Sequence, residues 1–176
     1  MQKNWYVLYT RPQCEKKVAT LLTKKKIETF VPYVNMDLPR LKKNKNVTRP
    51  LFKSYVFVYT TQQEFSALFQ SEGVISVLHW LGKPAVIAEA EINAIKEFTS
   101  GYQNIDLEKL PVNSNMLEKS FYKSAYTVEG NLVAVQNKTI KINLPSLGYA
   151  MIANLKEESV FGLDKSMSRN YLFAQS

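Results

Sequence analysis

The sequence predicts an α+β fold, namely a ferredoxin-like α/β plait followed by a small β-barrel. Two observations lead to this prediction. Strand-like and helix-like segments follow one another in the order βαββαβ up to residue 98, which is the order of a split βαβ plait. From Phe121 onward, short β-type runs alternate with turn residues, which is typical of a small closed or half-closed barrel. The 176 residues are enough for two such units.

The first strand and helix of the plait follow from the residue pattern. Residues 5–9 are aromatic and β-branched, as in a strand. Thr10 and Gln13 have the spacing of a helix capping box, and Pro12 suits a first helical turn. The helix behind them is expected to carry lysines on its outer face and an apolar stripe on the other. This stripe consists of Cys14, Val18, Leu21 and Leu22.

The rest of the plait is predicted from alternation, helical spacing and turn residues. Residues 35–50 are rich in lysine and interrupted by proline, so we expect an exposed basic loop or a loose hairpin there. The other strands are expected at 27–34, 50–60, 73–81 and 84–87, and the other helices at 64–70 and 89–98.

Beyond the plait, the pattern predicts a linker and a second domain. Residues 100–118 lose periodicity and are rich in polar turn formers, so they are the expected linker behind a first domain of residues 1–99. The barrel is expected at 119–157, with a polar tail to residue 176.

Charge and composition narrow the function classes. The net charge is +8. Residues 1–50 alone hold nine Lys and three Arg against three acidic residues, so the whole basic excess lies there and predicts a surface for a polyanion. One cysteine, Cys14, and one histidine, His79, give little basis for a disulfide, a metal site or a Cys-His catalytic pair. We therefore expect no catalytic residues, no metal and no cofactor.

The apolar run before Arg11 is too short for a signal peptide or a membrane span. No glycine-rich phosphate loop is present in the sequence. A cytoplasmic protein without a membrane partner is expected.

Several blocks of the sequence resemble the NusG family. WYVLYTRPQCEKKV, RPLFKSYVFV and GVISVLHWLGKPAVI are similar to the NusG N-terminal domain. NLVAVQNKTIKINLPSLGYAMIANL is similar to the degenerate KOW domain, an SH3-like barrel, of the specialised NusG paralogues. The resemblance covers roughly residues 4–156. Within the family, the chain resembles the RfaH-like antiterminators, particularly the UpxY group that acts on capsular polysaccharide operons.

This resemblance implies a transcription elongation and antitermination factor without enzymatic activity. Its implied partners are the clamp helices of the largest RNA polymerase subunit and the non-template DNA strand. The carboxy-terminal domain is a further candidate contact for a ribosomal protein or an antagonist protein.

The resemblance also implies two sets of site residues. The cavity that contacts polymerase is matched by Tyr9, Phe52, Tyr55, Phe57 and Leu81. The positions that meet non-template DNA are matched by Arg11, Lys17, Lys24 and Lys25. Because side chains alternate along a strand, a core position is an equal alternative for Phe57. A solvated lysine run remains the alternative for Lys24 and Lys25.

Two departures from the family pattern affect these expectations. Glu72 stands where RfaH-like proteins carry an arginine that helps to hold DNA, so a different DNA element is expected. Residues 65–68 replace the threonine-rich motif that contacts the polymerase gate loop, so that contact is expected to be absent or built differently.

Two other classes of function stay open on sequence grounds. One is an RNA- or ribosome-binding module, although the aromatic RNA-recognition signature is missing from the plait. The other is a metal-dependent nuclease, which needs clustered carboxylates. Against it, Glu15, Glu28 and Asp37 fall on three different expected elements.

The carboxy-terminal domain is expected to form strands, and not the helical hairpin that hides the cavity in RfaH. The runs at 127–128, 132–135 and 139–142 are rich in β-branched residues. The turn from Pro145 to Gly148 would interrupt a long helix, since proline costs about 3 kcal/mol inside one.

Overall fold

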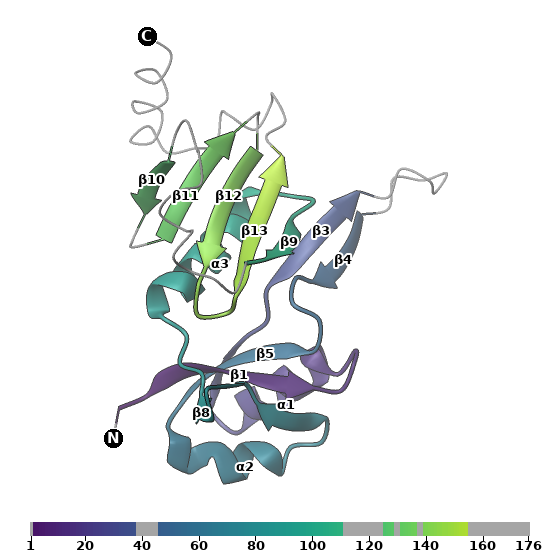
Figure 1. Ribbon diagram of the computed structural model, residues 1–176. Helices are drawn as coiled ribbons and strands as arrows, with labels where there is room; N and C mark the ends of the chain where they lie inside the picture. Colours follow the sequence, from purple (N-terminus) through teal and green to yellow (C-terminus); the bar gives the residue numbers. More distant parts are fainter. Residues whose placement is uncertain (1, 38–45, 111–124, 129–130, 137–138, 155–176) are drawn as a thin grey trace.

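A four-stranded antiparallel sheet forms the centre of the amino-terminal half of the computed structural model (Figure 1). The structure describes residues 2–37, 46–110, 125–128, 131–136 and 139–154. The strand order is β2-β5-β1-β6, which is the order of the predicted ferredoxin-like plait. The strands are β1 (Asn4–Thr10), β2 (Glu28–Phe30), β5 (Tyr55–Thr60) and β6 (Val74–Val77).

Two helices cover one face of this sheet, as Figure 1 shows beneath β1 and β5. They are α1 (Glu15–Lys24) and α2 (Phe65–Phe69), the latter preceded by a 3-10 turn at Gln62–Glu64. Strand alternation turns Tyr6 and Leu8 of β1 toward the helices, where they pack with Val18 and Leu22 of α1. The sequence prediction of an apolar helix stripe is confirmed at those two α1 positions, which are fully buried.

The predicted capping box at Thr10 and Gln13 is wrong. Helix α1 begins only at Glu15, and Gln13 has a φ of +64°, outside helical geometry. Thr10 is buried, and its backbone N–H donates to the carbonyl of Ser54 at 2.8 Å. The capping box forms instead at Thr61 and Glu64, before α2.

Several predicted strands are divided in the structure. The expected strand at 27–34 is split between β2 and β3 (Tyr33–Asp37), and the one at 73–81 between β6 and β7 (His79–Trp80). Residues 33–37 pair with β4 (Asn46–Pro50), so the expected basic segment does contain a hairpin. Strand β7 pairs with β8 (Lys83–Pro84) in a second hairpin.

The carboxy-terminal half forms a five-stranded antiparallel sheet in the order β10-β11-β12-β13-β9. This confirms the expectation of strands rather than helices for the described residues. No pairing between β10 and β9 closes the sheet among the residues that the structure describes, so a closed SH3-like barrel stays a prediction. The strands are β9 (Asp106–Lys109), β10 (Ala125–Val128), β11 (Asn131–Gln136), β12 (Thr139–Leu144) and β13 (Tyr149–Asn154).

Strand β9 comes from the segment that the sequence predicted as a linker, since it pairs with β13. Helix α3 (Glu89–Gly101) precedes it and buries Ile92, Ile95 and Phe98. These three side chains share one core with Phe57 of the plait and Met151 of β13. The carboxy-terminal sheet and α3 therefore pack over the sheet face opposite α1 and α2 (Figure 1).

Candidate functional site

Four aromatic side chains gather where the plait meets the carboxy-terminal sheet. Tyr9 and Tyr55 are paired on neighbouring strands, with ring centroids 6.0 Å apart. Phe52, in the turn before β5, lies parallel to Tyr55 with 6.2 Å between centroids and 6° between planes. Tyr149 of β13 meets Phe52 edge to face at 5.9 Å. Tyr9, Phe52 and Tyr55 are called the aromatic surface below, and Tyr149 packs against its Phe52 end.

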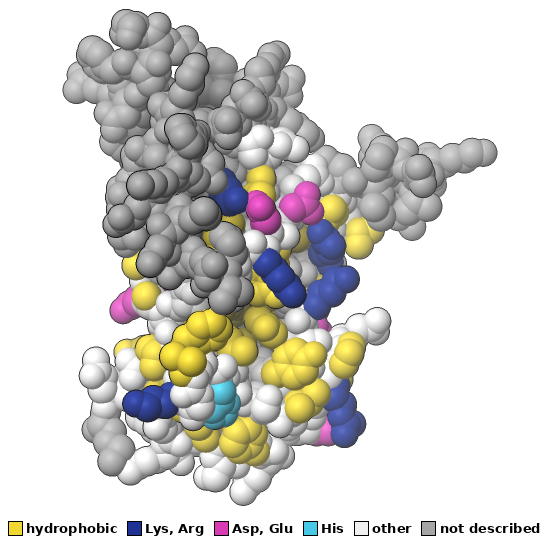
Figure 2. All heavy atoms as spheres, in the orientation of Figure 1, with side chains coloured by type: hydrophobic (Ala, Val, Ile, Leu, Met, Phe, Trp, Pro, Cys, Tyr) yellow, Lys and Arg dark blue, Asp and Glu magenta, His cyan; other side chains and the backbone are white. Residues whose placement is uncertain are grey.

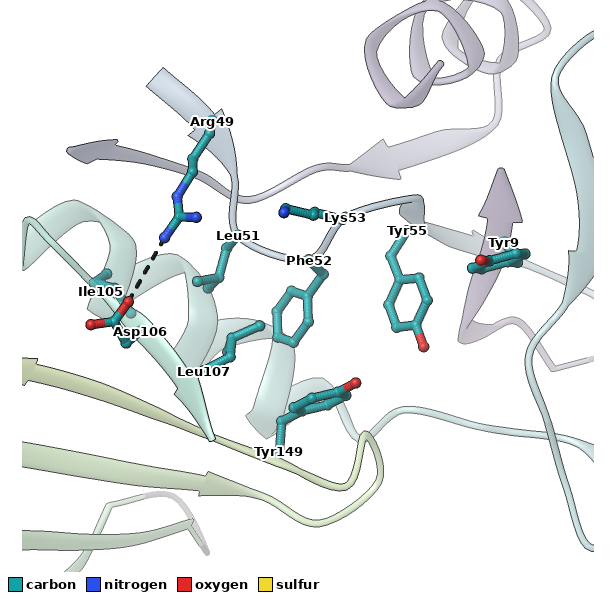
Figure 3. Close-up of a pocket in the computed structure, with 10 residues that line it drawn as sticks. All are labelled: Tyr9, Arg49, Leu51, Phe52, Lys53, Tyr55, Ile105, Asp106, Leu107 and Tyr149. Atoms are coloured by element: carbon teal, nitrogen blue, oxygen red, sulfur yellow. Dashed lines mark ion pairs between the residues drawn. The ribbon is translucent and has the colours of Figure 1, made fainter. Parts of the chain in front are cut away.

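The aromatic surface lines a pocket of about 490 Å³. In Figure 3, the rings of Phe52, Tyr55 and Tyr149 point into this shared space, and Arg49 reaches toward Asp106 from the other side. One guanidinium nitrogen of Arg49 lies 3.8 Å from the Asp106 carboxylate. The remaining lining residues are Leu51, Lys53, Ile105 and Leu107. Aromatic faces beside two cations suit binding of an amphipathic partner surface.

Burial and neighbouring hydroxyls both act on Tyr55. Burial raises the pKa of its phenol, and the nearby phenols of Tyr149 and Tyr9 raise it further. Since the ordinary pKa of tyrosine is already 10.0, the Tyr55 hydroxyl is protonated at neutral pH in any case and can donate a hydrogen bond to a bound partner.

The structure brings together three of the five residues expected in the polymerase-contacting cavity, namely Tyr9, Phe52 and Tyr55. Tyr9 is 43% exposed, so the cavity remains open at that end. Phe57 points to the same sheet face but is 0% exposed and packs on Phe52 at 5.7 Å. Leu81 lies apart, at the tip of the β7–β8 hairpin, where it is 89% exposed.

Three of the four residues expected to meet DNA lie at one side of α1. Lys17 forms an ion pair with Glu72 at 2.9 Å, just before β6. Lys25 donates to the carbonyl of Ala67 at 3.2 Å and to the hydroxyl of Ser71 at 3.0 Å. Arg11 is exposed, and its backbone N–H is held by the carbonyl of Gly73. This group, Arg11, Lys17 and Lys25, is called the basic surface.

Lys24 does not belong to the basic surface. It lines a different hollow, between α1 and the strands β2 and β3, together with Lys16. Because β2 and β6 are opposite edges of the sheet, the two groups of lysines lie on opposite sides of α1.

Sequence reasoning missed Tyr149, Arg49 and Lys53 as members of the site. Lys53 has a local signal, since it lies in the turn between Phe52 and Tyr55. Arg49 and Tyr149 reach the pocket through long-range packing of β4 and β13, for which the local pattern holds no signal. Figure 2 shows hydrophobic side chains below the carboxy-terminal sheet, with Lys and Arg side chains beside them.

The described residues hold no group of three or more His, Cys, Asp or Glu side chains that could bind a metal ion. Glu15, one of the three acidic residues among residues 1–50, is buried, and its carboxylate accepts a hydrogen bond from the backbone N–H of Ser54 at 2.6 Å. No helix in the described part of the chain is long and apolar enough to cross a membrane.

Comparison with known proteins adds a family match. A family model described as transcription termination factor NusG matches residues 3–96. No curated protein matches the chain. A solved structure described as "Domain interaction in Thermotoga maritima NusG" is similar with a TM-score of 0.50 and 18% identity, covering 88% of this chain and 94% of that one. A structure of the MjSpt4:Spt5 complex is similar with a TM-score of 0.33 and 16% identity, covering 85% and 99%.

Proposed function

Because the chain belongs to the NusG family of non-enzymatic transcription factors, which work with RNA polymerase in elongation and termination, we propose that it is a specialised elongation and antitermination factor. In this proposal it binds the clamp helices of the largest polymerase subunit and the non-template DNA strand, and so suppresses pausing and termination. A capsular polysaccharide operon is the proposed setting. The pairing of Tyr9 with Tyr55 beside Phe52 is the observation that carries the proposal.

The aromatic surface supports a contact with helices. Strand alternation turns Tyr9 and Tyr55 to the sheet face that α1 and α2 leave free, and their rings are not covered by the plait's own helices. Large aromatic side chains with a polar tip are the residues enriched at the centres of protein interfaces. A helix of the polymerase clamp laid across this end of the sheet would bury their exposed faces.

Tyr149 occupies part of the same surface. Its ring meets Phe52 edge to face, and Phe52, which also packs on Tyr55 and Phe57, is buried. A partner that contacts Phe52 must displace Tyr149, so polymerase and the carboxy-terminal sheet compete for Phe52. A ribosomal protein or an antagonist protein that binds the carboxy-terminal sheet would then shift the competition.

The basic surface is the proposed contact with non-template DNA. Lysine and arginine side chains attract phosphates and release counterions, which gives salt-dependent affinity without any base contact. Glu72 neutralises Lys17 in the free protein, so Arg11 and Lys25 carry the remaining attraction. An acidic residue at this position supports recognition of a DNA element unlike the one read by RfaH-like relatives.

The test measures polymerase affinity of a Tyr9→Ala, Tyr55→Ala double variant of the full chain. Truncating aromatic residues at an interface centre costs about 2 kcal/mol or more, so binding should weaken roughly 30-fold. Phe69→Ala is the matched control, because Phe69 is an aromatic residue of α2 whose exposed fraction, 47%, is close to the 43% of Tyr9. Wild-type affinity in a folded double variant would refute the assignment of the aromatic surface. Wild-type protein that binds RNA and no polymerase would favour the RNA-binding alternative.

A further inference from the structure

The aromatic surface depends on a tight turn between Phe52 and Tyr55. The backbone N–H of Tyr55 donates to the carbonyl of Phe52 at 3.4 Å, so these two residues are the ends of a four-residue β-turn. Such a turn brings its ends together, and the two rings lie parallel with centroids 6.2 Å apart (Figure 3). The arrangement of the rings is therefore set by the backbone of the two residues between them, Lys53 and Ser54.

Ser54 has a backbone conformation that is unfavourable for its residue type. Its φ is +64°, in the left-handed region, where the third position of a β-turn usually carries glycine or asparagine. The side chain of any other residue makes this conformation strained, so further contacts are needed to maintain it. Ser54 is also buried, so its backbone groups need partners within the protein.

Two hydrogen bonds fix Ser54 from both sides. Its N–H donates to Oε1 of Glu15 at 2.6 Å. Its carbonyl accepts a hydrogen bond from the N–H of Thr10 at 2.8 Å. Thr10 is the last residue of β1 and directly follows Tyr9. Ser54 therefore connects the Phe52–Tyr55 turn to Tyr9, and all three residues of the aromatic surface depend on its conformation.

Glu15 is a buried carboxylate at the start of a helix. It is the first residue of α1, it is 5% exposed, and no side chain caps this helix at Cys14. Burial of a carboxylate is unfavourable, and the positive end of the α1 dipole offsets part of the penalty. A methionine of similar length would be easier to bury, but it offers the Ser54 N–H only a weak thioether acceptor. The carboxylate thus does something that the packing of α1 alone does not require.

We propose that Glu15 is a positioning residue for the polymerase contact, because its carboxylate holds Ser54 in the left-handed conformation and so orders the aromatic surface before the partner arrives. The Glu15 side chain is buried and acts only through Ser54. A surface that is already ordered loses less conformational entropy on binding, and the apparent affinity falls with the fraction of molecules in the competent conformation. This inference rests on the proposed function, since it assigns a role through the aromatic surface.

The experiment titrates purified RNA polymerase with the full-length Glu15→Met and Glu15→Gln variants. Both substitutions keep the length and helix propensity of glutamate, but only glutamine keeps an oxygen that accepts the Ser54 N–H. Glu15→Met should bind about tenfold more weakly than wild type, because a hydrogen bond to a charged acceptor contributes roughly tenfold or more. Glu15→Gln should stay within about threefold of wild type. Hydrogen exchange of the Ser54 amide, followed by NMR, should accelerate only in Glu15→Met.

Ser54→Gly separates positioning from general stability. Glycine adopts a φ of +64° without steric strain. The combination of Glu15→Met with Ser54→Gly should therefore regain most of the polymerase affinity that Glu15→Met alone loses. A role of Glu15 in the packing of α1 predicts no such recovery, since Ser54→Gly adds no contact to that helix. Circular dichroism verifies that each variant is folded.

A second variant disturbs the turn and leaves Glu15 and α1 unchanged. Ser54→Thr introduces a β-branched side chain, for which a positive φ is more strained than for serine. It should weaken polymerase binding about fivefold. This measurement tests the inference even where Glu15→Met does not fold.

Glu64→Met is the matched control for Glu15→Met. The Glu64 carboxylate also accepts a hydrogen bond from a backbone N–H, that of Thr61 at 3.0 Å. It lies next to α2, outside the pocket that the aromatic surface lines. Glu64→Met should bind polymerase with wild-type affinity.

The reference in every titration is the Tyr9→Ala, Tyr55→Ala variant. If this variant binds weakly while folded Glu15→Met or Ser54→Thr binds as tightly as wild type, the positioning role is refuted and the proposed function stands. A loss in Glu15→Met that Ser54→Gly does not restore, or an equal loss in Glu64→Met, would assign Glu15 to the stability of the fold alone. Wild-type affinity of the reference variant would overturn the proposed polymerase contact, and this inference with it.

Discussion

The ring of Tyr149 meets the ring of Phe52 edge to face, with centroids 5.9 Å apart and planes inclined by 72°. This contact joins β13 of the carboxy-terminal sheet to the turn that leads into β5. Phe52 in turn packs on Phe57, at the centre of the shared core. One aromatic pair thus connects the carboxy-terminal sheet to the surface proposed for polymerase.

Tyr149→Ala is expected to strengthen polymerase binding, because it removes the ring that covers Phe52. An aromatic pair contributes about 1 kcal/mol beyond its buried area, so affinity should rise about fivefold in a titration with purified polymerase. Ile152→Ala is the control, since Ile152 lies on the same strand and is not part of the shared core. Unchanged or weaker binding by Tyr149→Ala would contradict the competition.

Glu72→Gln is expected to strengthen binding of single-stranded DNA. The substitution removes the Glu72 carboxylate, which lies 2.9 Å from the Lys17 ammonium. The hydrogen bond from Lys17 lowers the pKa of this carboxylate, so it is ionised and paired in the free protein. One more free cation should steepen the log-log dependence of affinity on salt by about 0.7, the increment for one phosphate on a single strand. The salt slope is measured by fluorescence anisotropy.

Glu97→Gln is the control for Glu72→Gln, because it removes the same charge from an exposed position of α3. An equal gain in both variants would mean that net charge, and not the release of Lys17, causes the effect. No gain in either variant would contradict the assignment of Lys17 to the basic surface.

Glu91 gives the interface between α3 and the carboxy-terminal sheet a pH dependence. It is 4% exposed, one carboxylate oxygen accepts the Ser146 N–H at 3.0 Å, and the other has no hydrogen-bond partner. Burial raises its pKa above the ordinary 4.5, and the hydrogen bonds from Ser146 offset only part of that rise. The folded protein therefore holds this proton more tightly than the unfolded chain does.

The sign of the effect follows from that raised pKa. The contribution of Glu91 to the free energy of unfolding is complete below pH 4.5 and is lost as the pH rises through the folded-state pKa. Glu91→Gln removes the ionisation, so the variant should gain stability relative to wild type as the pH is raised from 4 to 7. Urea unfolding at several pH values measures the difference. A difference that does not change with pH would contradict it.

The fold of the plait could be predicted because its signals are local. Alternation along β1 and β5 places Val7 and Phe57 on one sheet face and Leu8 and Val56 on the other, so the core alternative for Phe57 is the one that its burial supports. The predicted start of α1 was wrong because Thr10 forms a long-range backbone hydrogen bond to Ser54 and continues β1. Capping chemistry depends on where the strand ends, which the sequence does not state.

The site was harder to predict than the fold. Strand β9, with the sequence DLEK, is a charged edge strand without alternation, so only its pairing with β13 identifies it. Tyr149 reaches Phe52 across almost a hundred residues of chain. The separation of Lys24 from Lys17 and Lys25 depends on which sheet edge lies beside each side of α1. Each of these depends on tertiary packing.

The last prediction concerns Leu81, which has a φ of +50° in the two-residue loop of the β7–β8 hairpin. Gly82, the other loop residue, has a φ of +78°. Such loops favour asparagine or glycine at both positions, whereas leucine is strained there by roughly 1 kcal/mol. Leu81 is exposed and absent from both core clusters, so no packing within the described protein compensates the strain.

Leu81→Asn should therefore raise the free energy of unfolding by about 0.5–1 kcal/mol. The polymerase contact that the family resemblance implies for Leu81 makes a second expectation, namely that the same substitution weakens polymerase binding. Thermal unfolding and polymerase titration measure the two effects separately. Ile75→Ala is the control for loss of exposed apolar area, since Ile75 is exposed on β6. It should leave polymerase affinity unchanged. A stabilised Leu81→Asn variant with wild-type affinity would exclude Leu81 from the polymerase contact, because the strained side chain would then serve neither the fold nor the partner.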